Sequence, residues 1–215
     1  MDIMYIVIVL GVILVSMTLH EAMHAFMSYW LGDDTAKMQG RLTLNPIKHI
    51  DPFLTILLPL LLAISGVPSF VGARPVPFNP NPVRGGEGGA ALVALAGPLT
   101  NFVIAFFMFG IGVVTGTISS QGIEVSIAGT VIATAVSVNL GFFVFNMLPI
   151  PPLDGSRVIY AIAPEFIRRG MEVIERAGIL VIFALVLLAS SAIWAIMGGA
   201  IGGILQVFEV IFQLS

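Results

Sequence analysis

Long apolar stretches alternate with short polar segments along the chain, and their lengths indicate helices that cross a membrane. The hydrocarbon core of a bilayer is spanned by about 20 consecutive apolar residues in helical form. Four stretches reach this length, over residues of about 3–30, 90–118, 127–148 and 177–197. We therefore predict an all-α polytopic membrane protein whose transmembrane helices form a bundle.

Two other apolar stretches lack the pattern of a plain spanning helix. Residues 53–71 are interrupted by prolines and a glycine, and three prolines within 67–78 prevent a continuous helix there. We expect a short extended or β segment within a re-entrant or hairpin region over about 53–89. The apolar tail 201–214 is separated from the preceding stretch by Gly198-Gly199, and the pattern leaves its location unassigned.

The composition supports a membrane protein and excludes several kinds of chemistry. Apolar residues make up 58% of the 215 residues and charged residues only 10%, whereas soluble domains carry roughly 25% charged residues. The absence of cysteine excludes disulfides, thiolate metal sites and cysteine nucleophiles. With a net charge of −3 and nine Lys and Arg residues, no basic surface is expected for nucleic acid.

The basic residues predict how the helices are oriented. All nine fall within 31–89 and 149–178, and none lies in the turn at 119–126. If 53–89 enters the membrane and returns to the same side, all nine lie on one face, as the positive-inside rule favours. A single crossing there would divide them three against six. The small size and the lack of targeting signals favour a multi-pass protein of a prokaryotic cell membrane, with the basic segments on its cytoplasmic side.

The first predicted helix carries the sequence His20-Glu21-Ala22-Met23-His24. Residues four apart share one face of a helix, so the two imidazoles can bind one Zn²⁺ at about 2.0–2.1 Å. Glu21 lies beside them, where it can act on water without binding the metal. The alternative is a pair of incidental histidines in a packed helix. It is disfavoured because ionisable groups are costly inside a membrane and the chain has only three histidines.

A catalytic zinc site requires a third protein ligand, and the chain offers few candidates. For His49 a surface or structural role is favoured over ligation, and Glu87 and Glu124 lie in segments that read as polar, solvated loops. Asp154 follows the end of the helix predicted over 127–148. It either caps a helix that begins near Ser156 or contributes to the metal site. The predicted topology favours the metal site, because it brings Asp154 to the same side as the two histidines.

Three ordered motifs resemble those of the site-2 protease family of intramembrane zinc metalloproteases. They are His20-Glu21-x-x-His24, Gly97-x-x-x-Asn101 and Asn146-x-x-Pro149-x-x-x-x-Asp154-Gly155. The resemblance covers roughly residues 5–160 and is closest to small prokaryotic members without a PDZ or CBS domain. Residues 1–215 are accordingly expected to form a single membrane-embedded metalloprotease domain.

The resemblance implies roles for particular residues. His20, His24 and Asp154 would bind one zinc ion per chain, Glu21 would activate the attacking water, and Asn146 would lie near the metal. Asn146 would either donate a hydrogen bond to the developing oxyanion or make a polar contact between helices. For two further residues, Asn101 and Asn139, hydrogen bonds between helices are favoured over a direct role in the site.

The family's activity implies that the partners are transmembrane protein substrates and the lipid bilayer. The reaction would be hydrolysis of peptide bonds within or near transmembrane segments, as in regulated intramembrane proteolysis. Homo-oligomerisation is left open. The alternatives are a catalytically inactive family member that acts as a membrane scaffold, and an intramembrane metal transporter.

Overall fold

The computed structural model describes residues 3–49, 83–178, 180–182, 184 and 190–214. Most of the re-entrant region expected over 53–89 lies outside these residues, as does part of the helix expected over 177–197.

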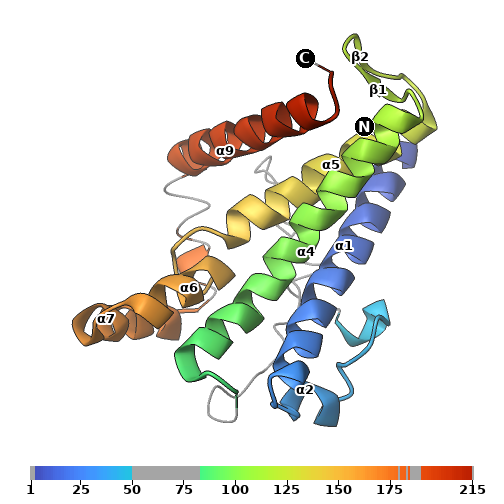
Figure 1. The fold of residues 1–215 in the computed structure, drawn as a ribbon. Helices are drawn as coiled ribbons and strands as arrows, with labels where there is room; N and C mark the ends of the chain where they lie inside the picture. Colours follow the sequence, from blue (N-terminus) through green and yellow to red (C-terminus); the bar gives the residue numbers. More distant parts are fainter. Residues whose placement is uncertain (1–2, 50–82, 179, 183, 185–189, 215) are drawn as a thin grey trace.

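Four of the described helices are long and apolar enough to cross a membrane. They are α1 (Ile3–Trp30), α4 (Gly86–Val114), α5 (Ile127–Asn146) and α9 (Ser190–Ile211). Together they form a helix bundle (Figure 1). The predicted all-α polytopic membrane fold is therefore confirmed.

The shorter elements lie in the segments that connect the long helices. They are α2 (Thr35–Met38), the 3₁₀ turn η1 (Pro46–Lys48), the strands β1 (Ile118–Ser119) and β2 (Gly122–Ile123), and the helices α6 (Asp154–Ile162) and α7 (Glu165–Arg176). The two strands form a small antiparallel hairpin that pairs Ile118 with Ile123. This hairpin connects α4 to α5.

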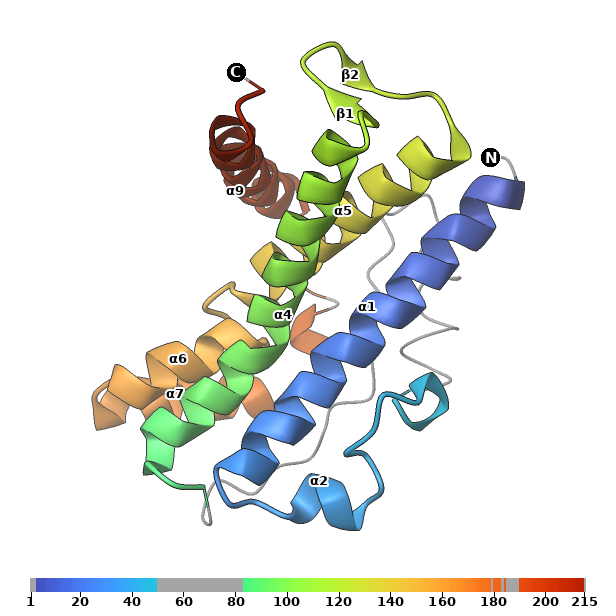
Figure 2. The same cartoon turned by 45° about the vertical axis from the view of Figure 1, so that its right-hand side comes forward.

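The ends of the helices show which segments share one end of the bundle. The backbone amide of Arg84 donates to the carbonyl of Leu31 at 2.8 Å, so α1 ends where α4 begins. From there α4 runs to the end of the bundle that carries the β-hairpin, and α5 returns (Figures 1 and 2). Asp154 follows α5 and therefore lies in the same half of the bundle as the C-terminal part of α1.

Aromatic packing holds α9 against α4. Phe208 of α9 is 1% exposed. Its ring centroid lies 5.7, 5.2 and 5.6 Å from those of Phe102, Phe106 and Phe109, respectively. Edge-to-face aromatic pairs at such distances add to the stabilisation from burial. This cluster fixes the C-terminal half of α9 to the bundle.

The break expected at Gly198-Gly199 is absent, because α9 runs without interruption from Ser190 to Ile211. A glycine inside a helix costs about 1 kcal/mol relative to alanine. Burial of Ile193, Met197 and Phe208 along the helix offsets this cost. The division into a helix over 177–197 and a separate tail over 201–214 was therefore wrong within the described residues.

The polar loop expected around Glu87 is also partly helical. Helix α4 begins at Gly86, earlier than the predicted start near residue 90, and Glu87 lies in its first turn. An acidic side chain is stabilised there by the helix dipole. Gly85, at the N-cap, has a φ of +90°, a conformation that glycine adopts without strain.

Candidate metal centre

Helix α1 places two imidazoles side by side in the interior of the bundle. His20 and His24 are one turn apart and are 3% and 9% exposed. Their Nε2 atoms lie 3.0 Å apart. The (i, i+4) spacing of the sequence therefore brings two potential metal donors to one point.

Asp154 meets the two imidazoles from another part of the chain. It is the first residue of α6, and its Oδ2 lies 3.2 Å from the Nε2 of His20 and 3.4 Å from the Nε2 of His24. Tetrahedral zinc with ligands at about 2.0–2.1 Å requires separations of about 3.3–3.4 Å between the ligand atoms. Among the described residues, these three side chains form a group that can hold a metal ion.

The second ring nitrogen of each histidine is occupied by a hydrogen bond to an oxygen. The Nδ1 of His20 lies 2.6 Å from the Oδ1 of Asn101, and the Nδ1 of His24 lies 2.7 Å from the carbonyl oxygen of Val93. Both oxygens can only accept hydrogen bonds, so each Nδ1 carries the hydrogen. The Nε2 atoms are then the ring nitrogens available to a metal, in the arrangement typical of histidine ligands.

A buried polar chain connects this centre to three helices. Asn101 of α4 donates from its Nδ2 to the Oδ1 of Asn139 on α5 at 2.8 Å. The Nδ2 of Asn139 in turn donates to the Oγ of Ser16 on α1 at 2.9 Å. Both asparagines are fully buried, where an unpaired amide would be costly. Through this series of hydrogen bonds, Asn101 both makes an interhelical hydrogen bond and orients His20.

Two glycines allow the helices to approach the centre. A Cβ atom on Gly97 of α4 would lie 2.4 Å from the Nε2 of His24 and 2.6 Å from the Nε2 of His20. A Cβ atom on Gly155 would lie 2.4 Å from the backbone oxygen of Met147. Only glycine fits either position without a shift of its surroundings. The glycines of the second and third sequence motifs thus have a steric explanation.

Glu21 and Asn146 have different surroundings in this structure. Glu21 is buried and directly follows His20 on α1. Asn146 is half-buried and donates from its Nδ2 to the carbonyl of Phe142, one turn back along α5, at 3.0 Å. Its amide is therefore used within its own helix in the state described.

The remaining candidate ligands lie away from the group. His49 is buried, and its Nε2 donates to the carbonyl of Thr43 at 2.8 Å, which is a structural role. Glu124 is exposed in the segment that follows β2, at the opposite end of the bundle (Figure 1). Neither belongs to the group formed by the two histidines and Asp154.

Sequence reasoning missed the backbone carbonyl of Val93 and the hydroxyl of Ser16. A backbone carbonyl leaves no signal in the sequence, because every residue has one. Ser16 lies four residues before His20 and so shares its helix face. That spacing could have suggested a polar neighbour of the histidines.

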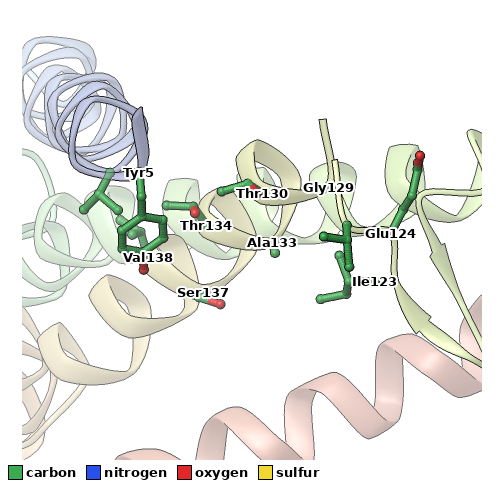
Figure 3. A pocket seen from close by; sticks show the side chains of 11 residues that line it. Tyr5, Ile123, Glu124, Gly129, Thr130, Ala133, Thr134, Ser137 and Val138 are labelled. Atoms are coloured by element: carbon green, nitrogen blue, oxygen red, sulfur yellow. The ribbon is translucent and has the colours of Figure 1, made fainter. Parts of the chain in front are cut away.

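A second feature lies between α1 and α5, away from the histidines. It is an open hollow of about 440 Å³. Tyr5 of α1 faces it from one side, and hydroxyl-bearing residues of α5 such as Thr130 and Thr134 line the other (Figure 3). The residues that line it do not include the two histidines or Asp154, so it is separate from the candidate metal centre.

The fold and the donor set together define a polytopic membrane protein with a candidate metal centre inside its helix bundle. Comparison with known proteins gives the family. The model of peptidase family M50 matches residues 113–190. The chain is 39% identical over 216 residues to "Putative zinc metalloprotease YwhC" of Bacillus subtilis (strain 168), with 97% of this chain and 93% of that protein covered.

A second relative also bears the name of a zinc metalloprotease. The chain is 30% identical over 181 residues to "Putative zinc metalloprotease Rip2" of Mycolicibacterium smegmatis, with 84% of this chain and 67% of that protein covered. No solved structure is significantly similar to the chain. The chain belongs to peptidase family M50, the site-2 protease family of zinc metalloproteases, and its cofactor is Zn²⁺.

Proposed function

We propose that this protein is an intramembrane zinc endopeptidase that hydrolyses peptide bonds within or near transmembrane segments of other membrane proteins. One observation carries the proposal. Two imidazoles from one helix turn and a carboxylate at least 130 residues further along the chain meet inside the membrane-spanning bundle. We propose that residues 1–215 act as a single metalloprotease domain in regulated intramembrane proteolysis.

His20, His24 and Asp154 would hold one zinc ion per chain through the two Nε2 atoms and a carboxylate oxygen. The donor set suits zinc, which binds imidazole and carboxylate ligands and keeps one position open in catalytic sites. Bound zinc supplies Lewis-acid chemistry, which polarises a carbonyl and makes water a stronger nucleophile near neutral pH. Asn101 and the carbonyl of Val93 would hold the rings in the required tautomer.

Glu21 would act as the general base and then as the general acid. Its carboxylate accepts a proton from the attacking water as the C–O bond forms. It then delivers this proton to the nitrogen of the scissile bond as the C–N bond breaks. The products are a carboxylate and an amine. The position of Glu21, buried on α1 directly after His20 and three residues before His24, supports this assignment.

Asn146 would donate a hydrogen bond to the oxyanion that develops on the scissile carbonyl. Preorganised donors of this kind commonly contribute about 10²–10³ in rate. In this structure the Nδ2 of Asn146 donates to Phe142. The proposed role therefore requires the amide to rotate away from its own helix when substrate binds.

The depth of the centre supports access from the end of the bundle where α1 terminates. His24 lies six residues before Trp30, the last residue of α1, which corresponds to about 9 Å along the helix axis. Water from that side therefore has a short path to the centre. The positive-inside rule assigns that end to the cytoplasmic face of the cell membrane.

The test compares Glu21→Gln with the wild type and with Glu124→Gln, a control at the other end of the bundle. Purified proteins are assayed for zinc content and for cleavage of a transmembrane substrate in detergent, with a chelator added to a parallel sample. Glu21→Gln should retain one zinc and lose cleavage, and Glu124→Gln should retain both. Cleavage by Glu21→Gln at the wild-type rate would refute the role of the base.

This experiment, together with a zinc-flux measurement on the same proteins reconstituted into vesicles, separates the alternative functions. A scaffold would show bound zinc and no cleavage in the wild type. A metal transporter would show zinc flux across vesicle membranes that does not depend on Glu21. Chelator-sensitive cleavage by the wild type contradicts the scaffold.

A further inference from the structure

The polar side of α7 is satisfied by contacts with α6. Arg157 of α6 forms an ion pair with Glu175 of α7, and the hydroxyl of Tyr160 donates to the Oε1 of Glu172 at 2.7 Å. Arg168 donates to two backbone carbonyls of the α6 segment and lies over the ring of Tyr160. These contacts clamp α6 and α7 into one hairpin and turn the same side of α7 inward.

The opposite side of α7 is apolar and exposed. Phe166 is 75% and Val173 66% exposed, and Ile174 is also exposed. Residues 166, 170, 173, 174 and 177 recur at the spacing of one helix face, and none of them is charged. In α7 the inward polar residues are half-buried against α6, whereas large apolar residues face outward. This is the reverse of the order expected for a helix in water.

The hairpin formed by α6 and α7 lies where the membrane surface is expected. It follows α5, which ends at Asn146, and it precedes α9, so it lies between two spanning helices in the chain. It projects sideways from the end of the bundle where α4 begins (Figures 1 and 2). The α6–α7 hairpin, with the exposed apolar residues of α7, therefore lies at one end of the spanning helices.

A second copy of the chain is a poorer match for this face. Twelve helical residues extend about 18 Å along a helix about 10–12 Å wide, so one side of it offers on the order of a few hundred Å². A stable protein–protein interface buries about 800 Å² per partner. Charged residues that border the apolar face, Glu165, Arg169 and Arg176, are typical of a helix that lies at a membrane surface.

We propose that α7 is an interfacial anchor. Its apolar face, formed around Phe166 and Val173, inserts into the boundary between lipid headgroups and acyl chains. The charged border remains in water or among the headgroups, where long basic side chains extend to the aqueous side. Because α7 is clamped to α6, the anchor also holds the helix whose first residue is Asp154. The inference does not depend on the proposed peptidase chemistry.

The experiment uses the absence of native cysteine. Single variants Phe166→Cys and Val173→Cys test the apolar face, and Glu165→Cys and Arg176→Cys serve as matched controls on the charged border. Each full-length variant is labelled with a nitroxide and reconstituted into phosphatidylcholine vesicles. Collisions of the nitroxide with oxygen, which concentrates in lipid, are compared by electron paramagnetic resonance with collisions with a water-soluble nickel chelate.

The proposal predicts that oxygen collisions dominate at positions 166 and 173 and nickel collisions dominate at 165 and 176. Dominant nickel collisions at 166 and 173 would overturn it, because the face would then be in water. Low collision rates with both reagents at these positions would also overturn it, because the face would be covered by protein, such as a second copy. If Phe166→Cys fails to fold, position 173 decides alone.

Discussion

Gly97→Ala adds one methyl group at the point where α4 passes the histidine pair. The new Cβ would lie 2.4 Å from the Nε2 of His24 and 2.6 Å from the Nε2 of His20, whereas ordinary van der Waals contact begins at 3.4 Å. The nearer nitrogen must therefore move by about 1 Å, half the length of a Zn–N bond of about 2.0–2.1 Å. Overpacking of a tight interior costs about 1–3 kcal/mol.

We expect Gly97→Ala to weaken zinc binding by at least the 10–100-fold typical of disturbed surroundings of a metal ligand. The measurement is competition for zinc against a chelator of known affinity, followed by a cleavage assay. Gly141→Ala is the matched control, because Gly141 lies inside α5 and a Cβ there meets nothing within 4 Å. Zinc affinity and cleavage in Gly97→Ala equal to those of Gly141→Ala would refute the close approach of α4.

Three further perturbations test the ligand, its support and the topology. Asp154→Asn keeps the side-chain shape and removes the charge, so metal analysis should show less than one zinc per chain; a full equivalent would contradict the ligand role. Asn101→Leu removes the acceptor for the Nδ1 of His20. Chelator competition should show a zinc affinity about 10–100-fold lower, and thermal unfolding should show a loss of stability of about 1–3 kcal/mol. Wild-type values in both assays would argue against support of His20 by Asn101. Cysteines replacing Lys37, Arg84 and Arg168 should all react with an impermeant maleimide from the same side of the membrane, and labelling from opposite faces would overturn the topology.

Much of the fold was predictable because local patterns determine it. The apolar run over residues 3–30 gives α1 with the same bounds, since the backbone of a spanning segment must satisfy its own hydrogen bonds in lipid and a helix does so. The pairing of His20 with His24 follows from helical spacing alone. The charge distribution predicted that Asp154 lies at the same end of the bundle as the two histidines, and its carboxylate lies 3.2 and 3.4 Å from their Nε2 atoms.

The rest depends on packing between distant segments. The continuity of α9 through Gly198-Gly199 is supported by burial of Ile193, Met197 and Phe208 against α4 and α5, which the local sequence does not encode. The sequences of α6 and α7 have the spacing of apolar residues typical of amphipathic helices. The longer hydrophobic stretches on either side mask this spacing in the hydropathy pattern of the chain. The steric role of Gly97 could be seen only once α4 was placed against α1.

The most direct test is to locate zinc in the purified, zinc-loaded protein by anomalous X-ray scattering at the zinc edge. The account predicts one peak per chain at about 2.0–2.1 Å from the Nε2 atoms of His20 and His24 and from a carboxylate oxygen of Asp154. A zinc peak bound elsewhere, or none between these three side chains, would contradict the account.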